Sequence, residues 1–234
     1  MGRPSFLITI DTEGDNLWSR PRTITCANAK FLPRFQSLCE SYGLKPTYLT
    51  SYEMVKCREF QELGEEVVRR GTGEVGMHLH AWNCPPLVPL TSDDSRYQPY
   101  LVEYAEDIMW RKIDYITKSL EDAFGVKMKS HRAGRWSLNE VYARILVEKG
   151  YLVDCSVTPH VSWRRIPGDP GGIGGSDYSD FPATPYLMNL KDISRSGDSP
   201  LLEVPVTIMG ERNGIFKKIR SFYGDRSVVQ RLLN

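Results

Sequence analysis

The chain has 234 residues with 41% hydrophobic content, and its 30 basic and 29 acidic residues leave a formal net charge of +1. This composition supports a sizeable core and argues against global disorder. The near-neutral charge gives no support to bulk electrostatic binding of nucleic acid or of an anionic membrane. The length suits one large domain or two small ones.

Cysteine usage and hydropathy bear on where the protein works. The five cysteines are irregularly spaced and include no CxxC pair, a pattern typical of buried thiols in a reducing compartment. The apolar segment from Phe6 to Ile10 is too short for the core of a signal peptide. No apolar run reaches the roughly 18 residues of a spanning helix. We therefore expect a cytoplasmic protein with no membrane insertion and no nucleic-acid partner, and the sequence leaves the oligomeric state open.

Strand and helix patterns alternate along most of the chain. Apolar, strand-like segments fall at 5–10, 46–50, 74–79, 127–130 and 151–157. Helical spacing of apolar residues falls at 27–42, 60–70, 100–124 and 138–149. This β-α-β-α rhythm predicts a parallel sheet or barrel.

The rhythm breaks after residue 157. Residues 158–185 are rich in Gly, Pro, Ser and Asp, and a loop of this length is usually functional or disordered. It lacks a lysine followed by Ser or Thr at phosphate-loop spacing, so it is not read as a nucleotide cradle. Strand-like segments return at 186–190 and 201–208, and 226–233 has the pattern of an amphipathic helix.

Three acids, Asp11, Glu13 and Asp15, lie where the first apolar strand stops. Ligands and catalytic groups collect at the carboxyl ends of parallel strands. Because Asp11 and Glu13 are two residues apart, an extended backbone turns both carboxylates to the same side. One can then bind a metal while the other acts as a base. An acidic turn that caps the next helix explains the segment equally well.

Two histidines, His78 and His80, lie at the end of the third strand. Their spacing places both imidazoles on one face, with Cβ atoms about 7 Å apart, so that both can bind one ion. Two histidines, one carboxylate and a position open to water make up a catalytic zinc site rather than a structural one. Zinc lowers the pKa of its water to about 7, and a second carboxylate can take the proton. Zinc is the default from the ligand types, with Co, Mn, Ni and Fe left open.

The segment from Ser130 to Trp136 follows one strand-like stretch and precedes a helix. Arg132 can pair with the base carboxylate and hold it ionised and oriented. Arg135 can contact substrate or another acid. A turn with solvated arginines is the alternative interpretation, and the neighbouring His131 is expected to be structural.

A fourth segment contains Asp154, which ends a strand and can orient an arginine or a histidine. His160 begins the long loop and can reach substrate, although a surface imidazole is the alternative. Aromatic faces suit sugar rings, but core packing explains a tryptophan equally well. The tryptophans nearest the candidate segments are Trp18, Trp82, Trp136 and Trp163.

Taken in order, the segments 8–13, 74–80, 132–136 and 154–156 resemble the motifs of the polysaccharide deacetylase superfamily, also called NodB-like or carbohydrate esterase family 4. The closer likeness is to its WalW-type branch of bacterial cell-surface polysaccharide loci. The resemblance implies an α/β fold in the form of a deformed (β/α) barrel. It also implies a divalent metal, most often zinc, and hydrolysis of an acetyl group from an N- or O-acetylated sugar or polysaccharide.

Carried onto this chain, the resemblance makes Asp11 the catalytic base, with Arg132 orienting it. Glu13 takes the place of a ligating Asp, and His78 and His80 resemble the paired metal histidines. We add Asp154 to the catalytic set. The expected substrate-binding residues are Arg135, Trp136, His160 and Trp82.

The chain departs from the family pattern in three ways. Thr12 separates two acids that are adjacent in the family, and this leaves open whether Asp11 itself binds metal. The family histidines are four apart, and Trp82 stands where the second would fall, so His80 must serve. The family offers a late histidine as general acid, and none follows His160. We expect a single catalytic domain over 1–234 that lacks its C-terminal part, or else another proton donor such as His160.

Two rival functions fit the same residues. One is a deformylase or cyclic-amide hydrolase that uses the same site on a different substrate. The other is a non-catalytic carbohydrate-binding relative, which the missing late histidine favours.

Overall fold

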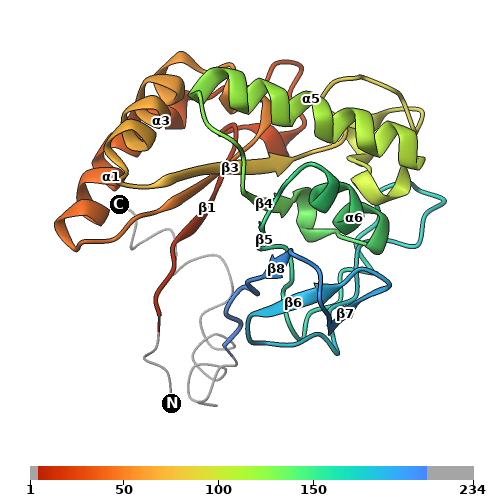
Figure 1. Ribbon diagram of the computed structural model, residues 1–234. Helices are drawn as coiled ribbons and strands as arrows, with labels where there is room; N and C mark the ends of the chain where they lie inside the picture. The colour runs from red at the N-terminus through yellow and green to blue at the C-terminus, as the bar shows by residue number, and fades with distance from the viewer. Residues whose placement is uncertain (1–4, 210–234) are drawn as a thin grey trace, which may run out of the picture.

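An eight-stranded sheet runs through residues 5–209, the part of the chain that the computed structural model describes (Figure 1). Its order is β1-β2-β3-β4-β5-β8-β6-β7. The pairs from β1 to β8 are parallel, whereas β6 pairs antiparallel with both β8 and β7. The strands are β1 (Thr9–Thr12), β2 (Thr47–Thr50), β3 (Glu74–Leu79), β4 (Ser130–Ala133), β5 (Val153–Asp154), β6 (Tyr186–Asn189), β7 (Asp192–Ser196) and β8 (Leu202–Glu203).

The order of the parallel strands shows how the sheet is wound. Each strand from β2 to β5 is added beside its predecessor on the same side, and β8 continues the series. A doubly wound sheet reverses its strand order, whereas a barrel does not. Within residues 5–209 the outer strands β1 and β7 do not pair with each other. The sheet is therefore wound like a barrel and stays open in this part of the chain.

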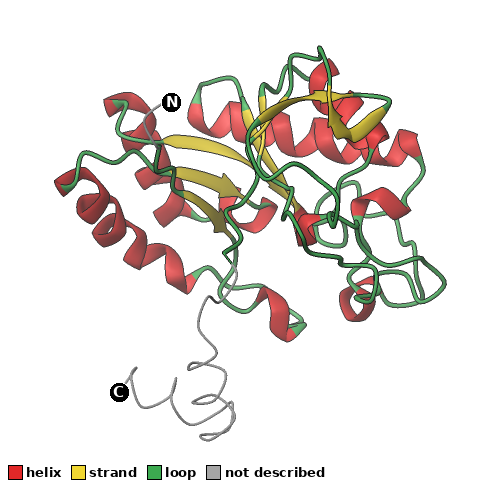
Figure 2. Ribbon diagram, turned by 90° about the horizontal axis from the view of Figure 1, so that it is seen from below, coloured by secondary structure: helices red, strands yellow, loops and turns green. Residues whose placement is uncertain are grey.

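Helices cover the sheet. Viewed from below, they flank the strands, and long loops gather beyond the arrowheads of the central strands (Figure 2). Helix α5 packs on both β3 and α3, and its residues Ile113, Ile116 and Leu120 are fully buried, as their spacing in the sequence predicts. The helical elements are η1 (Leu17–Ser19), η2 (Ala27–Phe31), α1 (Leu32–Ser41), α2 (Tyr52–Val55), α3 (Arg58–Arg70), α4 (Asp94–Tyr97), η3 (Leu101–Glu103), α5 (Glu106–Phe124), η4 (Gly134–Trp136) and α6 (Glu140–Glu148).

The first strand begins later than its apolar residues predict. Phe6 and Leu7 are exposed, and the ladder begins where Thr9 of β1 pairs with Thr47 of β2. Hydropathy locates apolar residues, whereas pairing decides which of them form a strand. As a result Asp11 lies inside β1 and not after it.

Other boundaries also differ from the predictions. The stretch 100–124 does not form one helix, because the extended backbone of Ala105 separates η3 from α5. The strand expected at 127–130 lies at 130–133 instead. The ranges 151–157 and 201–208 each contain only a two-residue strand, β5 and β8 respectively. Strand β7 has no counterpart among the predicted segments. The helical pattern at 226–233 lies outside the described residues. Among the described helices, none combines the length and apolarity needed to cross a bilayer.

Candidate metal centre

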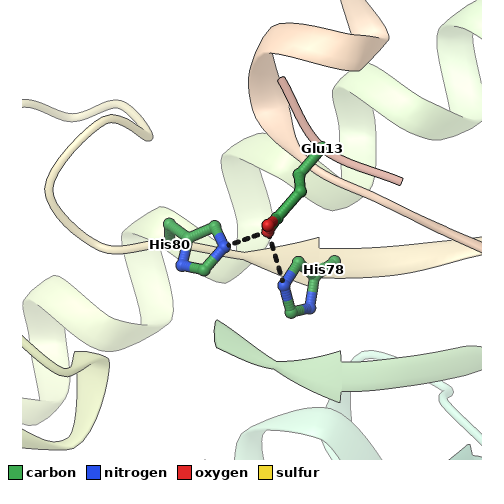
Figure 3. Close-up of side chains that lie close together, drawn as sticks. All are labelled: Glu13, His78 and His80. Atoms are coloured by element: carbon green, nitrogen blue, oxygen red, sulfur yellow. Dashed lines mark hydrogen bonds and ion pairs between the residues drawn. The ribbon is translucent and has the colours of Figure 1, made fainter. Parts of the chain in front are cut away.

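Three side chains converge at the carboxyl ends of β1 and β3 (Figure 3). Glu13 directly follows β1, His78 lies in β3, and His80 directly follows β3. Oε2 of Glu13 lies 2.8 Å from Nε2 of His80 and 3.4 Å from Nε2 of His78. One ligand atom of each residue lies within 4.8 Å of the others, so the three can share one cation. They are also the donor types of a catalytic zinc site, and they fit the divalent metal that the sequence predicts.

The main chain orients the ring of His78. Its Nδ1 lies 2.9 Å from the carbonyl oxygen of Arg132 on the adjacent strand β4, and it donates its hydrogen there. The tautomer that follows leaves the lone pair on Nε2, the nitrogen that faces Glu13. The rings of His78 and His80 lie 4.6 Å apart and nearly perpendicular, and both side chains are buried.

The electrostatics of Glu13 and His78 favour a cation, whereas burial lowers the pKa of His80 and keeps its ring neutral, as a metal ligand must be. Burial raises the pKa of the Glu13 carboxyl, but hydrogen bonds from His78 and His80 outweigh burial and hold this pKa well below its ordinary value. Burial lowers the pKa of His78, yet the negative charges of Asp11 and Glu13 raise it overall. A site that holds its carboxylate ionised and stabilises positive charge on a buried imidazole also attracts a metal cation.

Asp11 lies beside the three residues and is held by Arg132. Nη1 of Arg132 donates to Oδ1 of Asp11 at 2.6 Å, and Nη2 donates to Oγ1 of Thr9 at 2.5 Å. The third donor, Nε, reaches the carbonyl oxygen of Cys155 at 2.9 Å. The guanidinium is buried and lies 4.7 Å from the ring centre of Trp136. With three fixed bonds it presents Asp11 to the cavity in one orientation.

A cavity of about 560 Å³ opens over these groups. Its volume lies within the range of small-molecule sites. Aromatic and basic side chains form most of its wall. The lining residues are Asp11, Glu13, Trp18, Arg20, His78, Gln98, Tyr100, Arg135, Trp136, Trp163 and Ile166.

The backbone around Arg135 is strained. Arg135 and Trp136 have φ of 56° and 62°, in the left-handed region that side-chain-bearing residues seldom adopt, and such strain collects at functional sites. The Arg135 guanidinium donates to the carbonyl oxygens of Gln98 and Pro167 and lies 4.0 Å from the ring centre of Tyr100. Arg135 therefore joins two walls of the cavity as well as lining it.

Three residues expected at the site lie elsewhere. His160 is exposed and does not line the cavity. Trp82 also lies outside this wall, although its ring packs 4.5 Å from that of His80. Asp154 is fully buried and accepts hydrogen bonds from Nδ1 of His131 at 2.5 Å and from Oγ of Ser156 at 2.8 Å. The structure thus brings Asp154 to a histidine, but to His131 and not to His78 or His80.

A second buried carboxyl group lies next to Asp154. Burial raises the pKa of Glu203 well above its ordinary value, and the charge of Asp154 adds to the effect. Oε1 of Glu203 accepts from the backbone N–H of Val157 at 3.0 Å, and the carboxyl group also shares a hydrogen bond with Asp154. Glu203 is therefore neutral at moderate pH, and the negative charge of this buried pair lies on Asp154.

Sequence reasoning missed three supporting residues. Nε1 of Trp18 donates to Oε1 of Glu13 at 2.5 Å. Glu53 accepts from the N–H of Gly14 at 2.9 Å and from Nδ2 of Asn83 at 2.8 Å, so it ties together the loops that follow Glu13 and His80. An acid in the first turn of the short helix α2 gives no sequence signal for this role.

Lys112 is the third missed residue, and it is fully buried in α5. Its Nζ donates to the carbonyl oxygens of Ala81 at 2.9 Å, Cys84 at 2.8 Å and Pro86 at 2.6 Å. These three carbonyls belong to the turn directly after His80. Lys112 therefore holds that turn against helix α5. Its position in phase with the apolar residues of α5 is the sequence signal that could have identified it as buried.

Comparisons with known proteins bear on the fold. No protein-family model matches the chain, and no curated protein is significantly similar to it in sequence. A solved structure from Mycobacterium smegmatis, assigned as a polysaccharide deacetylase, matches 86% of this chain with a TM-score of 0.55 and 18% identity. One from Parabacteroides distasonis, assigned as a glycoside hydrolase/deacetylase, matches 85% with a TM-score of 0.52 and 14% identity.

The same fold occurs in a 4-alpha-glucanotransferase from Thermococcus litoralis, which matches 99% of this chain with a TM-score of 0.52 and 13% identity. The chain spans 58%, 44% and 30% of the lengths of these three proteins, in the order given. At such low identities the likeness concerns the fold alone, and it confirms the predicted α/β fold class.

Lys112 gives a test of how the turn after His80 is held. A Lys112→Met change leaves three buried carbonyl oxygens without their donor, and each such group costs about 1–3 kcal/mol. We expect the free energy of unfolding in urea to fall by at least about 2 kcal/mol, with weaker zinc binding in calorimetry. Lys118→Met, at an exposed position of the same helix, should change stability by less than about 0.5 kcal/mol. Equal stability of the two variants would show that the three hydrogen bonds of Lys112 do not stabilise the fold.

Glu203 gives a test of pH dependence. A glutamate with a raised folded-state pKa binds more protons when folded than when unfolded above about pH 4.3, so stability falls as pH rises, by up to about 1.4 kcal/mol per unit. Gln cannot ionise, and we expect Glu203→Gln to gain stability relative to the parent between about pH 5 and about pH 8. Urea unfolding across this range measures the difference, with the exposed Glu148→Gln as control. A constant difference between variant and parent would contradict the neutral form of Glu203.

Proposed function

We propose that this protein is a metal-dependent hydrolase that removes an acetyl group from an N- or O-acetylated sugar or polysaccharide. One observation carries the proposal: Glu13 and His78 line a cavity into which Arg132 also presents Asp11, and His80 lies directly behind them within reach of the same cation. Structural likeness to one protein assigned as a polysaccharide deacetylase and to another assigned as a glycoside hydrolase/deacetylase supports it, as does the order of motifs in the sequence.

Each residue has a defined part in this reaction. Glu13, His78 and His80 would hold a divalent cation, which would supply Lewis acidity and lower the pKa of water at the site. Asp11 accepts the proton of the attacking water, because Arg132 directs this carboxylate into the cavity. Zinc is the proposed ion from the ligand types.

The cavity walls suit a carbohydrate. Trp18, Trp136 and Trp163 line it, and flat aromatic faces pack well against sugar rings. The pairing of these walls with a proton-accepting carboxylate favours an acetylated sugar over a small cyclic amide. The WalW-type branch and a bacterial cell-surface polysaccharide remain predictions from the motif order.

A non-catalytic carbohydrate-binding protein is the second candidate. The specific observation in its favour is that, within the described residues, the cavity wall contains no histidine besides His78 to protonate a leaving amine. The two candidates differ in turnover and share the binding of acetylated saccharides.

Substitution of the site tests the mechanism. Asp11→Asn removes the proton acceptor, and we expect acetate release from chitotetraose to fall by about 10²–10⁴-fold while zinc stays bound. His78→Ala removes a ligand, and we expect it to lose both the ion and the activity. Acetate release and metal content by mass spectrometry measure the two effects, with Asp122→Asn on the exposed side of α5 as matched control.

Substrate panels separate the rival functions. Full acetate release by Asp11→Asn would remove the proposed mechanism. Formate release from formylated sugars or opening of ureides, without acetate release, would assign the site to the alternative amide chemistry. A parent protein that binds zinc and chitotetraose but releases no acetate would be a binding protein.

A further inference from the structure

A second cavity adjoins the one above the metal centre. It has a volume of about 390 Å³, and two residues, Arg20 and Gln98, line both cavities. The two cavities are therefore neighbours that meet at these two side chains. Its polar and charged lining comprises Arg20, Arg22, Thr23, Asn83, Ser95 and Gln98.

The charge balance of the second cavity is positive. Arg20 and Arg22 both line it, and no acidic residue does. Within residues 5–209 neither arginine takes part in an ion pair. In the first cavity, by contrast, the carboxylates of Asp11 and Glu13 already face Arg132 and the histidines. Among the residues that line the two cavities, the guanidinium groups without a carboxylate partner are therefore those of Arg20 and Arg22, together with that of Arg135, which donates to two carbonyl oxygens.

Gln98 supplies an independent observation. Its side chain is only 6% exposed, and its amide nitrogen has no hydrogen-bond partner. A buried polar group in this state costs free energy unless a partner arrives. The residue has φ of 51°, and its carbonyl oxygen is held by Arg135, so its backbone is kept in an uncommon conformation at the junction of the two cavities. A ligand oxygen at the junction would satisfy the amide.

The remaining wall is suited to a sugar ring. Trp82 and Leu17 line the second cavity and supply apolar surface beside the arginines. Guanidinium groups recognise carboxylate and phosphate oxygens through paired hydrogen bonds. The combination is that of a subsite for a sugar unit that bears an acidic group.

We propose that the second cavity binds the anionic substituent, a carboxylate or a phosphate, of an acidic saccharide whose acetylated unit occupies the first cavity. Arg20 and Arg22 bind the oxyanion, and Gln98 donates a hydrogen bond at the junction. The assignment of the first cavity to the acetylated unit rests on the proposed function. The substrate class is therefore an acidic, acetylated carbohydrate.

Calorimetric titration of the zinc-loaded chain tests this subsite without requiring turnover. The carboxylate arm compares tetrasaccharides of alternating N-acetylglucosamine and glucuronate, in their β-linked and mixed-linkage forms, with neutral chitotetraose. The phosphate arm compares N-acetylglucosamine 1-phosphate with N-acetylglucosamine and with inorganic phosphate. We expect the acidic member of at least one arm to bind at least about tenfold more tightly, and this preference to shrink as NaCl rises from about 0.05 M to about 0.5 M.

Substitutions test whether the preference for acidic saccharides arises in the second cavity. In Arg20→Gln/Arg22→Gln the ratio of acidic to neutral affinity should fall to about one. Arg69→Gln, an exposed position of α3 that also removes a positive charge, should leave the ratio as in the parent. Gln98→Met should lower the affinity for the acidic saccharide, with circular dichroism to confirm that it folds.

The outcomes separate this proposal from the proposed function. Equal affinity for acidic and neutral saccharides in both arms, or an acidic preference that survives in the double variant, would overturn the subsite. Inorganic phosphate binding as tightly as the phosphosugar would identify a free-anion site and also overturn it. An acidic preference without acetate release from any saccharide would uphold the subsite and contradict the deacetylase activity.

Discussion

The candidate site depends on one residue of β4, Arg132, which acts through both its side chain and its main chain. The guanidinium holds Asp11 of β1, while the carbonyl oxygen holds Nδ1 of His78 in β3. The parallel register that places His78 beside Arg132 makes both bonds possible. The proposed proton acceptor and the proposed metal ligand are thus both positioned by Arg132, one through its side chain and the other through its carbonyl oxygen. An error in the β3–β4 register would disrupt both at once.

Much of this arrangement could be predicted from the sequence. Apolar runs and helical spacing locate β2, β3, α3 and α6 to within about two residues, because their pattern agrees with their pairing and burial. Polar residues placed where apolar strands stop predict the meeting of Glu13 with His78 and His80, since parallel strands end at the same edge of the sheet. The family motifs suggest the contact between Asp11 and Arg132, which spacing alone leaves open.

The rest depends on contacts that local pattern does not record. Asp154 looks like Asp11 in the sequence, but β5 lies deeper in the sheet, and its carboxylate meets His131 and Glu203 in the core. Glu53 binds the backbone N–H of Gly14 and the side chain of Asn83, and Lys112 binds three backbone carbonyls. The sequence can mark Lys112 as buried, but it does not show which groups either residue binds. Gln98, at the junction of the two cavities, is singled out by its positive φ and by an amide nitrogen without a hydrogen-bond partner. Both features are visible only in the structure.

The bond from the His78 ring to a main-chain carbonyl has a consequence for how this site tolerates mutation. In many metal sites the outer partner of a histidine is a carboxylate side chain, which a single codon change can remove. Here the partner is a peptide oxygen that every amino acid possesses, so no substitution at position 132 abolishes it chemically. Evolution can therefore exchange the residues around the cavity, and with them the choice of substrate, while the ring orientation of this ligand is inherited with the fold itself.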